Sequence, residues 1–488
     1  MLEKDIEHSS ASPRTPRKGY EGGEEGIDPV AEKKLVRKLD LHIIPVVMLL
    51  YLLSFLDRVN IGNARLYGLE EDLNITSTQF QTAVSLLFVT YIASELPSNL
   101  VIKNYVRPSR WIAFITVSWG IVATLTGVVQ NYGGLIACRL FLGLVEGGLF
   151  PGCTMYLTFF YTKRELALRI GYLFVSAAIA GAFGGLLGFA IGFMDGIAGQ
   201  RGWRWIMILE GIPTFILGIA CWWILADDPE TARYLTPSEK EMVVTRRAAQ
   251  IGQTDIFAWP DARKALKDWK VYAICVGQFC TDNVLYGFST FLPTIIEGIQ
   301  PDASTAMVQV LTIPCYAVGA ISYMSAARLS DWTQLRGPVV VPITAVTVIG
   351  YALLISPVGA GARYAGCFLV AIGLYVAVGI PLAWLPSNCP RYGKRTTASG
   401  LQLTIGNSAG IMAPFLYPSD DGPRFVTGHA VTMALTAVAC VIYTLMSLYF
   451  ARENRKRERG DKDWVMEGLT EEEILALGDE NPRYRFAK

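Results

Sequence analysis

Charged residues and histidines are scarce in this sequence. Charged residues make up 17% of the 488 residues, whereas soluble proteins contain about 25%. The three histidines, His8, His42 and His429, are scattered and show no metal-ligand spacing with cysteine, so we expect no metal and no cofactor. A net charge of +1 argues against a nucleic-acid partner. We also find no nucleophile and base set, which argues against an enzyme.

The cysteines and the first residues of the chain exclude further classes. The nine cysteines are odd in number and lie almost all inside apolar runs, so we interpret them as small packing residues rather than disulfide partners. Residues 1–38 are polar and lack the apolar core of a signal peptide. The first hydrophobic run is therefore expected to act as an uncleaved insertion signal behind a disordered tail.

Hydrophobic residues are abundant, at 52%, and they form long runs. A run of about 20 apolar residues is long enough to cross a bilayer as a helix. Such runs fall near 41–61, 79–102, 110–130, 134–158, 168–194 and 204–225, and again near 271–296, 304–326, 338–357, 363–386, 396–417 and 428–450. The sequence therefore predicts an all-α membrane protein with twelve transmembrane helices in two six-helix bundles.

The polar segments between the runs predict the domain organisation and the orientation. Lys and Arg are concentrated in alternate connections, in the central polar segment and near both termini, which predicts that these parts are cytoplasmic. Repeated six-helix halves are typical of secondary transporters. The expected units are a disordered cytoplasmic tail (1–40), an N-terminal bundle (41–225), a cytoplasmic central loop (226–270), a C-terminal bundle (271–450) and a cytoplasmic tail (451–488).

The stretch from Arg139 to Gly152, RLFLGLVEGGLFPG, places two full charges inside the fourth run. A charge at the centre of a membrane helix costs roughly 3 kcal/mol, so such residues usually face a cavity or a partner. Arg139 and Glu146 are seven residues apart and share one helix face. Gly143 and Gly147 lie on the same stripe and are expected to let a neighbouring helix approach closely. A buried ion pair with ordinary glycine packing remains the alternative interpretation.

Five stretches resemble the major facilitator superfamily, and within it the fungal allantoate and nicotinate permease branch of the anion:cation symporter family. They are Phe55–Ala64 (FLDRVNIGNA), Glu95–Asn99 (ELPSN), Arg139–Gly152, Tyr286–Pro293 (YGFSTFLP) and Gly478–Arg485 (GDENPRYR). The loop signature of the superfamily is degraded after the second run and only partly kept after the eighth, where Trp332 stands in the usual basic position. The fifth run lacks the Gly-Pro pair typical of proton antiporters, which favours symport over export.

The charged residues of the first and fourth runs are the main site candidates. Arg offers planar donors to a carboxylate, and a buried acid such as Glu146 can carry a proton. The resemblance implies that Asp57, Arg58, Arg139 and Glu146 serve substrate binding and proton transfer. We assign proton coupling to Glu146, the main carrier, and to Asp57. We assign substrate binding to Arg58, the anchor, and to Arg139, which also forms a coupled gating or relay pair with Asp57. The roles of the two arginines can be exchanged. The alternative for Asp57 and Arg58 is a helix-end pair that reaches the lipid interface.

The second half of the chain supplies polar candidates for substrate binding. Gln278, Asp282 and Tyr286 recur every four residues and predict one wall of a cavity. Trp384 and Asn388 end the tenth run and Asn407 lies in the eleventh, where they are candidates to stack on or hydrogen-bond a small ring. The alternative is that these polar groups only connect neighbouring helices.

These observations predict a plasma-membrane, proton-coupled importer of a small organic anion. A nicotinate-like monocarboxylate is the first hypothesis, and allantoate or pantothenate is also compatible with the resemblance. The expected partners are the anion, protons and the lipid bilayer, and the expected state is a monomer. The alternatives are an exporter of an acidic metabolite and a nutrient sensor that does not transport.

Overall fold

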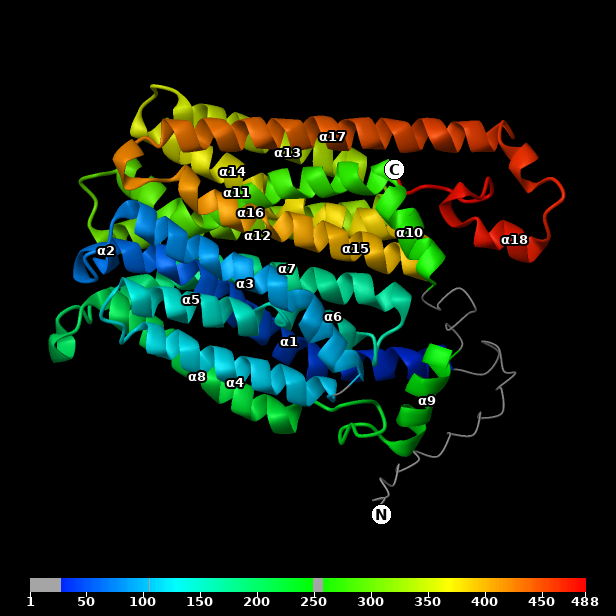
Figure 1. Cartoon of the computed structure of the whole chain (residues 1–488), viewed down its shortest axis with the longest axis horizontal. Helices are drawn as coiled ribbons and strands as arrows, with labels where there is room; N and C mark the ends of the chain where they lie inside the picture. The colour runs from blue at the N-terminus through cyan, green and yellow to red at the C-terminus, as the bar shows by residue number, and fades with distance from the viewer. Residues whose placement is uncertain (1–27, 105, 249–257) are drawn as a thin grey trace, which may run out of the picture.

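The structure is a computed structural model that describes residues 28–104, 106–248 and 258–488, and within these residues it is helical with no strand. The first set of long helices is α1 (Pro29–Leu66), α3 (Ser77–Asn104), α4 (Pro108–Thr126), α5 (Tyr132–Glu146) continued by α6 (Leu149–Leu157), α7 (Lys163–Gly192) and α8 (Gly202–Ile224). The second set is α11 (Trp269–Ile299), α12 (Thr305–Thr333), α13 (Gly337–Ile355), α14 (Ala360–Ser387), α15 (Tyr392–Asn407) continued by α16 (Ala409–Met412), and α17 (Val426–Glu458). These helices run side by side in two bundles (Figure 1).

Hydropathy supports a membrane location for the bundles. In the described part of the chain, nine helices are long and apolar enough to cross a membrane. The predicted twelve crossings are completed by α3, α11 and the α15–α16 pair.

Glycines set the close helix contacts. A Cβ atom on Gly143 would lie 2.1 Å from the carbonyl oxygen of Leu87, and one on Gly147 would lie 2.3 Å from that of Tyr91. Residues 143 and 147 therefore have to be glycine for α5 to pack this closely on α3. Gly120 allows a similarly close contact between α4 and α8, because a Cβ atom at this residue would lie 2.4 Å from the backbone nitrogen of Phe215.

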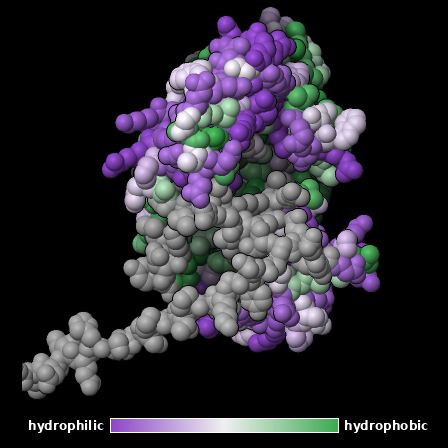
Figure 2. Space-filling view, turned by 90° about the vertical axis from the view of Figure 1, so that its right-hand side faces the viewer, coloured by the Kyte–Doolittle hydropathy of each residue, from purple (hydrophilic) through white to green (hydrophobic). Residues whose placement is uncertain are grey.

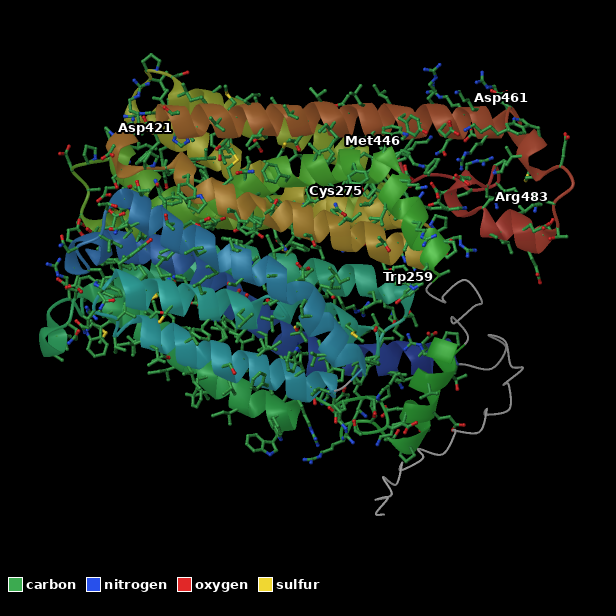
Figure 3. All side chains as sticks on the ribbon, viewed as in Figure 1. Trp259, Cys275, Asp421, Met446, Asp461 and Arg483 are labelled. Atoms are coloured by element: carbon green, nitrogen blue, oxygen red, sulfur yellow. The ribbon has the colours of Figure 1, made fainter. Side chains whose placement is uncertain are left out.

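Both described ends of the chain lie at one end of the bundles, which we call the terminal end, and the opposite end is the distal end (Figure 1). Asp421 marks the distal end and Arg483 the terminal end (Figure 3). The terminal end also carries α9 (Pro237–Ala248), α10 (Trp259–Lys267) and α18 (Glu471–Ala476), whereas α2 (Leu69–Asp72) lies at the distal end. Figure 2 views the terminal end, where hydrophilic residues gather over the C-terminal part.

The polar segments contain more structure than the sequence predicts. The first helix begins at Pro29, capped by the Asp28 side chain, so the tail expected over 1–40 is helical from residue 29, and residues 1–27 lie outside the described residues. The expected central loop contains α9 and α10. Lys38 of α1 pairs with Glu239 of α9 at 2.7 Å, and Asp261 of α10 pairs with Arg391 at 2.8 Å. Within the segment 226–270, α9 therefore contacts the N-terminal bundle and α10 contacts the C-terminal bundle.

Candidate functional site: a buried charge network between the bundles

A narrow cavity lies between the two bundles, with α1, α3 and α5 on one side and α11 on the other. Its lining includes Arg58, Arg139, Phe88, Tyr286 and Thr290. The cavity has room for about one water molecule. The structure is therefore closed around its candidate site and would have to open to admit a solute.

The contact between Arg58 and Glu146 is the centre of the site. Arg58 donates from Nε and from Nη2 to Oε1 of Glu146, each at 2.7 Å, and Ser54 Oγ donates to the same oxygen at 2.5 Å. The other oxygen, Oε2, is buried and has no hydrogen-bond partner among the described residues. Arg58 also lies over the ring of Tyr91, 4.6 Å from its centroid. Glu146 thus neutralises the cavity arginine while one of its oxygens stays available to a proton.

Asp57 and Arg139 form the second part of the network. Trp119 Nε1 donates to Asp57 Oδ2 at 2.7 Å. Arg139 is only 2% exposed, interacts electrostatically with Asp57 and Glu146, and has an Nε atom with no partner in the described part of the chain. At about 1.5 Å per residue, Asp57 and Arg139 lie about 10–14 Å from the distal ends of their helices, whereas Glu146 lies about 20 Å from it. Asp57 and Arg58 therefore lie inside the bundle rather than at a lipid interface.

The candidates on α11 divide into two groups. Tyr286 lines the cavity, and its hydroxyl donates to Asn407 Oδ1 at 2.7 Å. Gln278 donates to Asp282 Oδ1 at 2.7 Å and accepts from Gln402 at 3.1 Å, which forms a buried network inside the C-terminal bundle away from the cavity lining. The structure therefore brings Tyr286 and Asn407 to the site, and it uses Gln278 and Asp282 to join α11 to α15.

Trp384 and Asn388 do not line the cavity. Trp384 Nε1 donates to the carbonyl oxygen of Ala487 at 2.9 Å, and Asn388 both donates to that oxygen and accepts from the Ala487 amide. Their polar groups hold the end of the chain at the terminal face. The assignment of these two residues to substrate binding stays a prediction, although a polar residue at the end of a membrane helix can also receive a folded-back tail.

Two buried acids were missed by the sequence analysis as site residues. Glu95 on α3 is 8% exposed, and Glu210 on α8 is 7% exposed. Oε2 of Glu95 and both oxygens of Glu210 have no hydrogen-bond partner within the described ranges. Glu210 interacts electrostatically with Asp57, and Glu95 with Arg58. The available signal was a single acid inside an otherwise apolar run, the same signal that identified Glu146.

No group of metal-ligating side chains occurs in the described residues, and none of the cysteines there forms a disulfide. The charged side chains that the structure places at the site are carboxylates and arginines, which can form ion pairs, and the carboxylates can exchange protons. Such a site can bind an anion and release it again without changing its covalent structure.

Comparison with known proteins assigns the chain to a family. A family model described as Major Facilitator Superfamily matches residues 47–414. A transporter of Schizosaccharomyces pombe, described as uncharacterized, is 41% identical over 443 residues, which cover 90% of this chain and 88% of that one. The high-affinity nicotinic acid transporter of Saccharomyces cerevisiae is 30% identical over 465 residues, which cover 93% of this chain and 85% of that one.

Solved structures share the fold at low sequence identity. A bacterial homolog of the human lysosomal transporter Spinster, in an inward-facing and occupied conformation, gives a TM-score of 0.65 at 15% identity and covers 88% of this chain and 99% of its own. The xylose transporter XylE from E. coli, in a partially occluded inward-open conformation, gives 0.64 at 13% identity, with 82% and 96% covered. Both have the same arrangement of helices as this chain.

Proposed function

Because the chain belongs to the Major Facilitator Superfamily and is a multi-pass membrane transporter rather than an enzyme, we propose that it imports a small organic anion together with a proton. The contact between Arg58 and Glu146 carries this proposal. Arg58 offers planar donors beside the cavity between the bundles. Its charge is neutralised by Glu146, which has one oxygen without a partner in the described residues. A carboxylate and a proton can therefore exchange at one pair of side chains.

The proposed cycle begins with protonation of Glu146. The proton removes the charge that holds Arg58, so Arg58 becomes available to the carboxylate of the substrate. The bundles then move and the site opens at the other end, where the anion and the proton leave and Glu146 pairs with Arg58 again. One proton and one monoanion make the cycle electroneutral, so uptake rises at acidic outer pH and depends little on membrane voltage.

A nicotinate-like pyridine carboxylate is the substrate we propose first. Aromatic rings lie near Arg58. Its guanidinium lies over Tyr91, and Phe88 and Tyr286, whose ring centroids are 4.5 Å apart, line the same cavity. Flat rings stack favourably on such side chains. The yeast relative that is named a nicotinic acid transporter supports the same class of substrate.

We further propose that the protein acts as a monomer in the plasma membrane, with the terminal end in the cytoplasm. The excess of Lys and Arg in the segments at that end supports this orientation. The two bundles over 41–225 and 271–450, joined by the central segment over 226–270, remain our proposal for the domain organisation, with α1 beginning at Pro29 and with α9 and α10 inside the central segment.

Uptake by cells that express the full chain tests the proposed function. Labelled nicotinate, allantoate and pantothenate are supplied at acidic and at neutral outer pH, with and without a protonophore. We expect one small monocarboxylate to accumulate at acidic pH and to stop accumulating with the protonophore. Uptake that follows voltage and ignores pH contradicts symport, and faster loss of preloaded anion without uptake supports the export alternative.

The variant Glu146→Gln tests the proton carrier. We expect it to exchange labelled for unlabelled anion across the membrane but not to concentrate it, because the amide cannot take up and release the coupled proton. Asp302→Asn is the matched control, since it makes the same chemical change on an exposed residue outside the bundles. Full accumulation by Glu146→Gln would remove Glu146 from the mechanism.

A further inference from the structure

Glu95 is a buried acid beside the site to which the proposed cycle assigns no role. It begins the Glu-Leu-Pro-Ser-Asn motif of α3 and is 8% exposed. Oε2 has no hydrogen-bond partner among the residues that the structure describes. A buried carboxylate with a free oxygen is costly when ionised, which makes it a candidate for a group that changes partners during function.

Glu95 is within reach of the arginine that is the proposed substrate anchor. Tyr91, over which Arg58 lies, is one helical turn before Glu95 on the same face of α3. One turn corresponds to about 6 Å along the helix axis toward the terminal end. Arg58 interacts electrostatically with both Glu146 and Glu95. Arg58 therefore has two acids near it. If its guanidinium moved by about one helical turn along α3, its partner would change from Glu146 to Glu95.

Asn407 connects Glu95 to the other bundle. The hydroxyl of Tyr286 donates to Asn407 Oδ1 at 2.7 Å, so the amide nitrogen of Asn407 is the group left to interact electrostatically with Glu95. This contact crosses from α3 to α15 and exists only while the two helices are close. Separation of the bundles at the terminal end removes the Asn407 donor from Glu95 and admits water, which lowers the cost of its ionised form.

We propose that Glu95 is the release-side acid of the transporter, which takes Arg58 from the bound anion when the bundles part at the terminal end. This inference rests on the proposed function, because it requires an anion bound to Arg58. The carboxylate of Glu95 replaces the carboxylate of the substrate as the partner of Arg58, and the displaced anion leaves through the opening. When the bundles close again, Glu95 returns to Asn407 and Arg58 returns to Glu146.

The variant Glu95→Gln in the full chain tests the inference. The amide of glutamine carries no charge and cannot compete for Arg58, so we expect the anion to be released more slowly. Maximal uptake and KM should both fall. Each should fall by roughly tenfold, because the variant loses one hydrogen bond to a charged group. Labelled nicotinate should bind the purified variant correspondingly more tightly. Glu95→Asp keeps the charge and should recover part of the rate. An unchanged KM with unchanged maximal uptake, or a raised KM, would overturn the inference.

A second variant keeps the test decisive if Glu95→Gln does not accumulate in the membrane. Asn407→Ser removes the amide group that interacts with Glu95, so Glu95 competes for Arg58 throughout the cycle, and KM should rise. A fall in KM, or no change, contradicts the inference. If the unmodified protein shows no proton-dependent uptake of any carboxylate, the proposed function fails. If that uptake is intact and only the predicted shifts in KM are missing, the role of Glu95 alone fails.

Discussion

The two arginines at the cavity differ in their contacts. Arg58 makes two donations to Glu146 and lies over Tyr91, whereas Nε of Arg139 has no partner in the described part of the molecule. The sequence favours Arg58 as the substrate anchor and pairs Arg139 with Asp57, but it leaves the roles of the two arginines exchangeable. The geometry favours Arg58 as the residue that exchanges between an internal acid and the substrate.

Replacement of each arginine by lysine tests this difference. Lysine keeps the charge of Arg58 but loses its planar donors and its stacking on Tyr91. We expect Arg58→Lys to raise KM for the transported anion roughly tenfold or more, the loss of a charge-assisted hydrogen bond. Arg139→Lys is the matched variant and should lower maximal uptake more than it changes KM. The measurement is uptake against substrate concentration, normalised to the amount of protein in the membrane, and the reverse pattern would exchange the two roles.

At the scale of single elements, residues 478–488 form a docked segment on the terminal face of the C-terminal bundle. The ring of Phe486 stacks on Phe450 at 4.9 Å, and its backbone exchanges two hydrogen bonds with the side chain of Asn454. Asp479 is held by Lys270 at 2.7 Å and by Lys394 at 2.8 Å. The segment thus joins α11, α15 and α17, with Trp384 of α14 bound to Ala487 as well.

The charges of this docked segment keep it in place over a wide pH range. Burial acts to raise the pKa of Asp479, but Lys270 and Lys394 lower it more, so that the pKa lies below its ordinary value. A lowered pKa in the folded state means that the ion pairs stabilise docking above the ordinary pKa of aspartate, as long as Lys270 and Lys394 are protonated. Burial acts to lower the pKa of both lysines, but Asp479 and Asp268 raise it more, so that both pKa values lie above their ordinary value. On the acid side the stabilisation is lost as the pH falls through the lowered pKa of Asp479, so mild acidification leaves the segment docked.

The substitution Phe486→Ala should release the docked segment. Phe486 is 4% exposed, and loss of a buried phenylalanine ring costs roughly 3–5 kcal/mol. We expect faster proteolytic cleavage after residue 470 in the purified protein, with the bundles intact. Leu475→Ala is the control, because Leu475 is largely exposed on α18. Equal cleavage rates in the two variants would mean that the ring does not hold the segment.

The sequence predicts the long helices well and the docked segments poorly, for a physical reason. Apolar runs and the seven-residue spacing of Arg139 and Glu146 are local patterns, and they suffice for the two bundles and for the central acid of the site. The ion pair between Lys394 and Asp479 joins residues 85 positions apart, and nothing local marks either as a partner. For the same reason the sequence predicts Trp384 as a substrate ligand and does not predict its hydrogen bond to the end of the chain.

At the scale of the whole molecule, the distal end is closed by contacts between the bundles. Arg65 of α1 donates to the carbonyl oxygen of Tyr417 and to Ser419, and Ser85 of α3 donates to the carbonyl oxygen of Ile411 at 2.9 Å. A Cβ atom on Gly62 would lie 1.8 Å from the carbonyl oxygen of Thr290. Only a glycine at residue 62 lets α1 and α11 meet this closely, so closure at this end is a feature encoded in the sequence.

A cross-link between the bundles tests whether this closure must open during transport. The amide of Ser419 donates to Ser77 Oγ at 3.0 Å, so these two residues are in direct contact across the bundles, and Ser77→Cys with Ser419→Cys is the pair we choose for a disulfide. The native cysteines are all buried or half-buried and free, so they offer few competing thiols. We expect oxidation to stop transport, and a reductant to restore it, because the site can no longer open at the distal end. Each single variant should keep its activity under oxidation. Full transport by the cross-linked protein would mean that substrate enters without separation of α3 from the distal loop of the C-terminal bundle, and that the closed contacts at Arg65 and Gly62 are not a gate.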